Sequence, residues 1–215
     1  MSTLAQFLDP ANVSLKICGV TLPDDAHQLI EHKVDALGVN FWPQSKRHLP
    51  WENAGWLRQL KGRILRVGVF VNQPVLPAEL YGQDLIDVVQ LHGDESPEEA
   101  AIYRNNGIPF IKAIGVNTIA DLERAADFGA SAILLDAPAP GTYGGTGHTF
   151  DWTQAIRFKQ QHPDIPVILA GGIGPGNAVM AVHTVRPAAL DVASGAEFEP
   201  GIKDIDKVTA IQAAL

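Results

Sequence analysis

The sequence has 215 residues, of which 46% are hydrophobic, so it can form one domain with a sizeable core. Its formal net charge of −8 argues against a nucleic-acid partner, because binding a phosphate backbone requires a basic face. A single cysteine excludes an internal disulfide, and no apolar run reaches the about 18 residues of a membrane-spanning helix. The first ten residues lack the basic-then-apolar layout of a signal peptide. We therefore expect a cytoplasmic protein that binds neither nucleic acid nor membrane.

After a short leader at residues 1–13, strand-like and helix-like segments alternate along the rest of the chain, without a linker or a low-complexity stretch. The strand-like segments are short apolar runs at 14–18, 35–41, 64–71, 87–91, 109–114, 131–136, 166–170 and 189–193. The helix-like segments lie near 23–33, 51–61, 77–83, 96–106, 118–128, 152–161, 175–185 and 204–214.

This strict strand-then-helix alternation predicts a parallel sheet. Eight such units are compatible with an open doubly wound sheet or with a (β/α)8 barrel, and both bind ligands at the carboxyl ends of their strands. We favour a single (β/α)8 TIM barrel over residues 14–215. The number of units supports the barrel, as do the glycine-rich turns that follow the last three strands.

Cys18 lies at the end of the first predicted strand, where Gly19 opens a loop before the next helix. A lone cysteine is most often a small buried hydrophobe. A position at a strand end in a barrel-like pattern favours a catalytic role instead. Proton abstraction requires the thiolate, so we expect a nearby basic group or helix N-terminus to lower the pKa of Cys18.

Asp136 ends the sixth predicted strand, after an apolar run. It is either a loop cap that accepts backbone N–H groups or a proton donor whose pKa is raised in a partly dry site. In a closed barrel, strands one and six are three steps apart, so Asp136 and Cys18 would face each other across the mouth. That arrangement suits proton transfer at two atoms of one substrate.

Three glycine-rich turns follow the last three strands, at 141–148, 170–175 and 193–196. Glycine allows backbone N–H groups to approach an anion closely, and the turns after strands seven and eight are a frequent phosphate site in such barrels. Any one turn alone would more simply end a strand. Three in succession predict phosphate binding, with 141–148 as a candidate lid.

Two further strand-end residues are candidates for substrate binding. Arg47, after the second strand, either holds a carboxylate or is an exposed surface charge. His92, after the fourth strand, either contacts substrate or is a hydrogen-bonded structural residue. The sequence contains no HxH, HExxH or CxxC motif, so we expect no metal site. Lys16 and Asp191 would lie on adjacent strands of a closed barrel, and we predict that they approach each other inside it.

Together these motifs resemble the phosphoribosylanthranilate isomerase family of tryptophan biosynthesis. The similar segments run in order from the first strand to the last: 16–21 (KICGVT), 35–38 (DALG), 41–47 (FWPQSKR), 67–72 (VGVFVN), 89–93 (VQLHG), 134–136 (LLD), 144–152 (GGTGHTFDW), 169–173 (LAGGI) and 191–195 (DVASG). The resemblance implies a (β/α)8 barrel that uses no cofactor.

The resemblance also implies an Amadori rearrangement of N-(5-phosphoribosyl)anthranilate to 1-(2-carboxyphenylamino)-1-deoxyribulose 5-phosphate. Asp136 would be the general acid at the ring oxygen, Cys18 the general base at C2, and Arg47 the partner of the anthranilate carboxylate. His92 is expected in the substrate site. The phosphate would be surrounded by Gly145, Thr146, Gly147, Gly171, Gly172, Ser194 and Gly195.

Some alternatives stay open at this point. Asn40 departs from the apolar residue expected at its position, and it either tunes the pocket or repacks the strand. A related barrel isomerase acting on the histidine-pathway phosphoribosyl amine would use an aspartate in place of Cys18. A barrel that binds a sugar phosphate without turning it over is a third alternative. The partner is expected to be a small phosphorylated substrate, and the protein a monomer or a homodimer.

Overall fold

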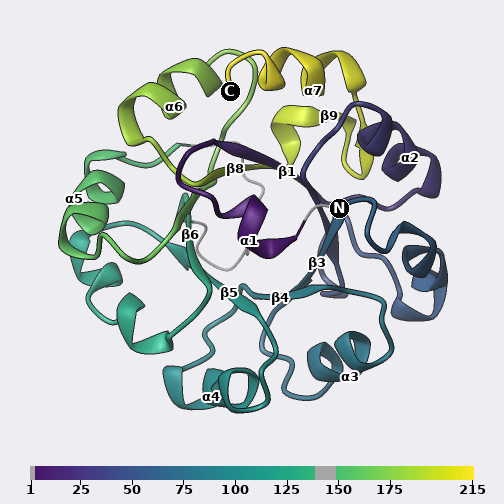
Figure 1. Cartoon of the computed structure of the whole chain (residues 1–215), viewed down its shortest axis with the longest axis horizontal. Coiled ribbons are helices and arrows are strands. Elements are labelled where there is room, and N and C mark those ends of the chain that lie inside the picture. Colours follow the sequence, from purple (N-terminus) through teal and green to yellow (C-terminus); the bar gives the residue numbers. More distant parts are fainter. Residues whose placement is uncertain (1–2, 139–148) are drawn as a thin grey trace.

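The structure is a computed structural model that describes residues 3–138 and 149–215. Eight parallel strands pair in chain order and β8 pairs with β1, so the sheet closes into a barrel (Figure 1). The predicted (β/α)8 barrel is thereby confirmed. The strands are β1 Ser14–Cys18, β2 Ala36–Asn40, β3 Leu65–Phe70, β4 Val88–Leu91, β5 Phe110–Gly115, β6 Ala132–Asp136, β7 Val167–Leu169 and β8 Ala189–Val192.

Helical segments form a ring around the barrel and pack their apolar faces against the outward-facing side chains of the strands (Figure 1). At the start of α4 (Pro97–Asn105), the Ser96 hydroxyl accepts a hydrogen bond from the backbone N–H of Glu99. The Glu99 carboxylate accepts one from the backbone N–H of Ser96, and Pro97 lies in the first turn. The α-helices of the ring are α2 Pro23–Glu31, α3 Leu76–Gly82, α4 Pro97–Asn105, α5 Thr153–Gln161, α6 Ala178–Val185 and α7 Ile205–Gln212.

Two of the predicted helix-like segments, 51–61 and 118–128, are helical, but their helices are of the 3₁₀ type. The first is η1 Trp51–Leu60, which starts after Pro50 without a side-chain cap and contains Gly55, so its α-helical preference is weak. The second divides into η2 Ile119–Leu122 and η3 Ala125–Phe128, because the backbone leaves helical geometry between them.

The segment after β8 contains elements that the sequence pattern did not indicate. A single 3₁₀ turn, η4 Ser194–Ala196, leads into β9 Glu197–Glu199, which pairs antiparallel with β10 Ile202–Lys203. The Thr21 hydroxyl donates to the carbonyl oxygen of Gly201 at 2.8 Å, which ties this hairpin to the loop after β1. Strands of two or three residues are too short to show a hydrophobic period.

The leader closes the amino-terminal end of the barrel. Its helix α1, Leu4–Phe7, lies across the barrel axis in Figure 1. Phe7 is 1% exposed and packs against inward-facing apolar residues near the starts of the strands, among them Leu65 and Ile168. This end of the barrel is therefore filled by hydrophobic side chains.

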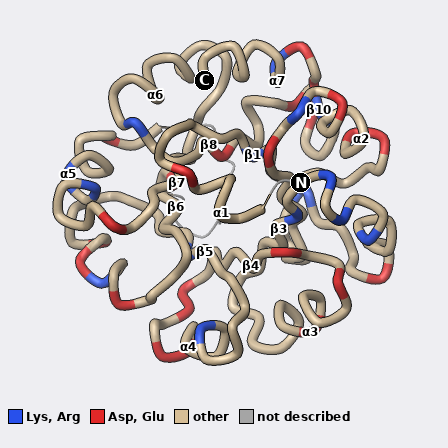
Figure 2. Tube along the Cα trace, viewed as in Figure 1, with Lys and Arg blue, Asp and Glu red and all other residues tan. Residues whose placement is uncertain are grey.

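The other end of the barrel interior is polar. Lys16, Gln90 and Asp191 are buried and project inward, and the parallel register places Lys16 opposite Asp191 and Cys18 opposite Gly38. Charged residues of both signs are interspersed around the outer ring (Figure 2). Across the described residues, no helix is long and apolar enough to cross a membrane. The fold thus places its inward-facing polar groups at the carboxyl ends of the strands.

Candidate active site

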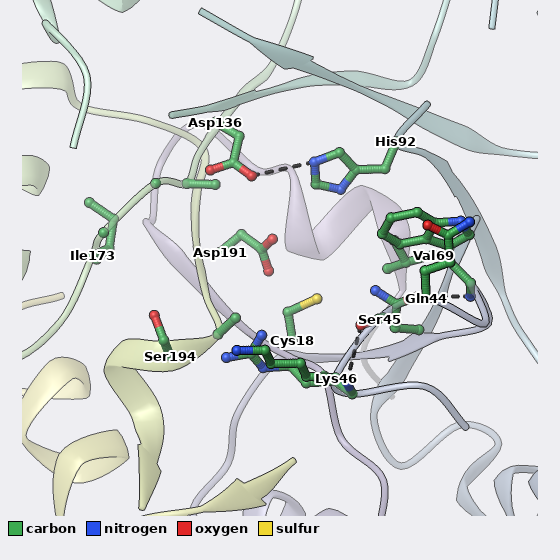
Figure 3. A pocket seen from close by; sticks show the side chains of 18 residues that line it. Cys18, Gln44, Ser45, Lys46, Val69, His92, Asp136, Ile173, Asp191 and Ser194 are labelled. Atoms are coloured by element: carbon green, nitrogen blue, oxygen red, sulfur yellow. Dashed lines mark hydrogen bonds and ion pairs between the residues drawn. The ribbon is translucent and has the colours of Figure 1, made fainter. Parts of the chain in front are cut away.

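A cavity of about 450 Å³ opens at the carboxyl ends of the strands, a volume within the range of small-molecule sites. Cys18 and Asp136 lie on opposite sides of it, with Asp191 between them in the view of Figure 3. Seven of the predicted site residues line this one cavity: Cys18, Arg47, His92, Asp136, Gly171, Gly172 and Ser194. Gly145, Thr146 and Gly147, with the whole candidate lid at 141–148, lie outside the described residues.

Cys18 ends β1 with its side chain turned into the barrel, because Leu15 and Ile17 alternate with it and face the outer core. Burial raises the pKa of the Cys18 thiol, and the nearby charges of Lys16 and Lys203 only partly oppose that effect. The pKa is therefore above its ordinary value, and the predicted lowering was wrong. The basic groups are present as expected, but desolvation outweighs them.

Lys16 and Asp191 form a buried ion pair inside the barrel, as predicted from their places on neighbouring strands. The Lys16 ammonium donates to Asp191 Oδ1 at 2.7 Å, and the Lys16 side chain is fully buried. Burial opposes the charge of Lys16, but Asp191 and Cys18 outweigh it and raise the pKa of Lys16 above its ordinary value. Lys16 thus remains a cation beside the thiol.

Asp136 is held by two neighbours. The backbone N–H of Ala137 donates to Oδ1 at 2.8 Å, and Nε2 of His92 lies 3.3 Å from Oδ2. The amide nitrogen of Gln90 lies 3.2 Å from Nδ1 on the other side of the imidazole. With that amide donating to Nδ1, the ring proton sits on Nε2 and points at Asp136. The loop-cap interpretation of Asp136 is confirmed by the bond from Ala137, and the carboxyl also lines the cavity, where a proton donor would have to lie.

Arg47 is a pocket residue and not an exposed surface charge. Its Nε donates to the carboxylate of Glu197 at 2.8 and 3.0 Å, and its Nη2 donates to Glu197 Oε2 at 2.6 Å. The hydrogen bond to Glu197 raises the pKa of Arg47. The Arg47 stem packs on Gly19, whose φ of +76° and missing side chain leave room for it. A ligand carboxylate would therefore meet the Nη1–Nη2 edge of Arg47.

Glu197 and Lys203, which the sequence did not indicate, hold the cavity residues Arg47 and Cys18 without lining the cavity themselves. The Lys203 ammonium donates at 2.6 Å both to Glu197 Oε1 and to the carbonyl oxygen of Cys18. Burial alone would raise the pKa of Glu197, but the hydrogen bonds and charges of Arg47 and Lys203 lower it below its ordinary value. These two residues belong to the β9–β10 hairpin, and no motif in the sequence marked that hairpin.

The glycine turns after β7 and β8 lie against each other. Gly171 and Gly172 have φ values of +79° and +62°, which L side chains rarely adopt. A side chain on Gly195 would overlap the carbonyl oxygen of Ile173. Asn177, which was also missed, holds the β7 turn by accepting from the N–H of Gly174 and donating to the oxygen of Gly172, each at 2.9 Å. The turns can therefore bring backbone N–H groups close to an anion.

Asn40 lines the cavity at the end of β2. Its side-chain oxygen accepts from the backbone N–H of Trp42 at 2.9 Å, which orders the start of the loop that carries Arg47. The residue noted in the sequence thus lines the pocket and also orders the local backbone. Within residues 3–138 and 149–215, no group of three or more His, Cys, Asp or Glu side chains is placed to hold a metal ion.

Known proteins similar to this chain cover almost its whole length. The family model of N-(5'-phosphoribosyl)anthranilate (PRA) isomerase matches residues 15–214. The chain belongs to the PRA isomerase family. The PRA isomerase of Nitrosomonas eutropha is 41% identical over 92% of this chain and 93% of its own. That of Geobacter metallireducens is 44% identical over 91% of this chain and 95% of its own.

Solved PRA isomerase structures agree with the fold. The enzyme from Thermotoga maritima has a TM-score of 0.85 and 38% identity, covering 94% of this chain and 98% of its own. A second PRA isomerase structure contains reduced 1-(o-carboxyphenylamino)-1-deoxyribulose 5-phosphate, with a TM-score of 0.81 and 35% identity over 93% of this chain and 96% of its own. Membership of the PRA isomerase family confirms the resemblance seen in the motifs and decides against the histidine-pathway alternative.

Proposed function

We propose that this chain catalyses the Amadori rearrangement of N-(5-phosphoribosyl)anthranilate to 1-(2-carboxyphenylamino)-1-deoxyribulose 5-phosphate in tryptophan biosynthesis. The observation that carries the proposal is the placement of Cys18 and Asp136 on opposite sides of one cavity (Figure 3). The same cavity presents Arg47 for a carboxylate and glycine turns for a phosphate. Family membership supplies the identity of the substrate.

In this mechanism Asp136 donates its proton to the ring oxygen of the sugar while the C1–O bond breaks. The nitrogen lone pair forms a C=N bond, which gives an open-chain Schiff base. The Cys18 thiolate then removes the proton at C2, and the electrons of that bond form the enolamine. Return of a proton to C1 and loss of the hydroxyl proton at C2 give the ketone, so atoms and electrons balance without a cofactor.

His92 acts on Asp136 in this scheme. Its Nε2 lies 3.3 Å from Oδ2 of Asp136, and a proton on Nε2 points at the carboxyl when the Gln90 amide donates to Nδ1. A donor beside the carboxylate stabilises the charge that forms on Asp136 when it gives up its proton. His92 is thus a positioning residue for the acid, and its imidazole also lines the substrate cavity.

The two ends of the substrate are anions. The anthranilate carboxylate would bind the Nη1–Nη2 edge of Arg47, since Glu197 occupies the other edge. The phosphate would bind the glycine turns, with contributions from the residues of the sequence prediction: Gly171, Gly172, Ser194, Gly195 and, outside the described residues, Gly145, Thr146 and Gly147. Binding both ends fixes C2 between the acid and the base.

The test is turnover of freshly generated N-(5-phosphoribosyl)anthranilate, followed by loss of its anthranilate-type fluorescence. We expect loss of signal with this chain. Turnover of the histidine-pathway phosphoribosyl amine, which carries no anthranilate, is followed by separating substrate from product, and we expect none. A folded protein that binds the phosphorylated substrate without changing its fluorescence would instead support a binding-only barrel. We place the enzyme in the cytoplasm, as a monomer or a homodimer. The Thermotoga maritima relative is dimeric, and light scattering on this chain decides between the two states.

A further inference from the structure

A fully buried lysine lies next to the only thiol of the chain. Lys16 and Cys18 are two residues apart on β1, so both side chains project into the barrel. The Lys16 side chain has no exposed surface, while that of Asp191, its ion-pair partner, is 8% exposed. Burying an ammonium group in a protein interior is costly unless its charge is compensated. Asp191 compensates the charge of Lys16. The function of this buried ion pair beside Cys18 then has to be explained.

The opposing strand leaves space for the ammonium group. Gly38 is the β2 residue in register with Cys18. A Cβ atom on Gly38 would lie 2.9 Å from the Cys18 sulfur and 2.9 Å from the Lys16 nitrogen. Both atoms therefore border the volume that a side chain at position 38 would fill. Glycine at this position keeps the cation beside the sulfur.

The charges around the sulfur come from four elements. Lys16 on β1 opposes the effect of burial most strongly, by its charge and by a hydrogen bond to the thiolate. Asp191 on β8 raises the pKa of Cys18, whereas Lys203 on β10 lowers it, as Lys16 does. Arg47, from the loop after β2, interacts with the thiolate charge as well. Lys203 and Arg47 share the carboxylate of Glu197, whereas Lys16 has Asp191 as its own counter-ion.

We propose that Lys16 is a positioning residue for the isomerisation: its ammonium group, kept in place by Asp191 and Gly38, stabilises the thiolate form of the Cys18 sulfur against the effect of burial. The inference rests on the proposed function, in which the thiolate is the base. Lys16 itself does not touch the substrate in this scheme. It acts by increasing the fraction of enzyme in which Cys18 is able to accept a proton.

Cys18 is the only cysteine of the chain, so alkylation by iodoacetamide reports on this thiol alone. The rate of alkylation is measured against pH in four proteins: the parent, Lys16→Met, Asp191→Asn and the exposed-lysine control Lys61→Met. We expect Lys16→Met to raise the midpoint of the profile by about one pH unit or more, a tenfold loss of thiolate. Asp191→Asn lowers the midpoint, because the thiolate then becomes the counter-ion of Lys16. Lys61→Met leaves it unchanged.

Opposite shifts in the two variants distinguish a charge effect from a loss of packing, which would disturb both profiles in the same sense. Lys16→Met leaves Asp191 buried without a partner, so the double variant Lys16→Met/Asp191→Asn is included to preserve folding. Its midpoint should lie above that of the parent, because the effect of Lys16 on Cys18 exceeds that of Asp191. Unchanged midpoints in Lys16→Met and the double variant would overturn the inference.

Activity separates this inference from the proposed function. If both are right, Lys16→Met lowers kcat about tenfold or more near neutral pH with little change in KM, and the deficit shrinks as pH rises and the thiol ionises. A raised midpoint with unchanged kcat would support the effect of Lys16 on Cys18 but contradict the role of Cys18 as the base. A lost kcat that no rise in pH restores, with an unmoved midpoint, would contradict the role of Lys16.

Discussion

The fold surrounds the side chains of Cys18 and Asp136 with different contacts. Asp136 keeps one oxygen on the backbone of Ala137 and has His92 against the other. Cys18 is half-buried at the cavity, and desolvation there holds the pKa of its thiol above the ordinary value in spite of Lys16. The sequence predicted both residues at strand ends on one face of the barrel, and both line the cavity. It could not give the pKa of Cys18, because the balance between desolvation and charge depends on three-dimensional distances.

The pH dependence of catalysis follows from that balance. A base acts in its deprotonated form, so a raised pKa of Cys18 moves the rise of kcat/KM toward higher pH. We expect kcat/KM to increase with pH through the neutral range, with a midpoint above the ordinary value for a thiol. A steady-state profile of the parent enzyme measures this. A rise centred in the acidic range would show that the thiolate is not the limiting group.

Arg47 should affect binding more than chemistry. Arg47→Ala removes a charge-assisted hydrogen bond to the substrate carboxylate, and the expected result is a KM raised about 10- to 100-fold with a much smaller change in kcat. Steady-state kinetics measure both constants. Arg58→Ala is the matched control, since Arg58 lies at the surface and donates to the carbonyl oxygen of Gln83. An unchanged KM in Arg47→Ala would place the carboxylate elsewhere.

Among the elements, the eight barrel strands were predictable because strands buried on both sides read as apolar runs between turns. The 3₁₀ geometry of η1, η2 and η3 was not, since it has the same periodic pattern as a short α-helix. The β9–β10 hairpin was not predicted, because its strands are too short to show a hydrophobic period. Glu197 and Lys203 lie in this hairpin and were therefore not predicted either. Their roles come from contacts with Arg47 and Cys18 that are far away in the sequence.

The contact between the β7 and β8 turns gives an element-scale prediction. Gly195→Ala places a methyl group on the carbonyl oxygen of Ile173, so the two turns must separate. We expect weaker binding of the phosphate end, seen as a KM raised about tenfold and weaker competitive inhibition by inorganic phosphate. Gly176→Ala is the control, because nothing lies within 4 Å of its added Cβ. Equal inhibition constants in both variants would remove the β8 turn from the phosphate site.

At the scale of the whole molecule, the barrel has one apolar end and one polar end. Phe7 closes the apolar end, while Lys16, Gln90 and Asp191 project into the barrel toward the other end, where the cavity opens (Figure 3). Stability and catalysis are thus assigned to opposite ends of the strands. The sequence predicted the catalytic end from its motifs. It did not predict that the leader packs into the barrel, because one short helical turn carries no sign of its partner.

Phe7 tests this division. Phe7→Ala removes a fully buried ring and should lower the free energy of unfolding by about 3–5 kcal/mol, with kcat and KM unchanged for the protein that stays folded. Urea denaturation measures the first quantity and steady-state kinetics the second. Phe198→Ala is the control, since Phe198 is 80% exposed and its loss should cost little stability. Equal stabilities of the two variants would mean that α1 does not close the barrel.

The central claim is that Asp136 and Cys18 act as acid and base on one bound substrate. Its most direct test is kcat for Asp136→Asn and Cys18→Ser, measured by fluorescence. The affinity of each variant for reduced 1-(o-carboxyphenylamino)-1-deoxyribulose 5-phosphate is measured alongside. The account predicts that kcat falls about 100- to 10,000-fold in each variant while the affinity changes little. A kcat close to that of the parent in either variant would contradict the role of that residue.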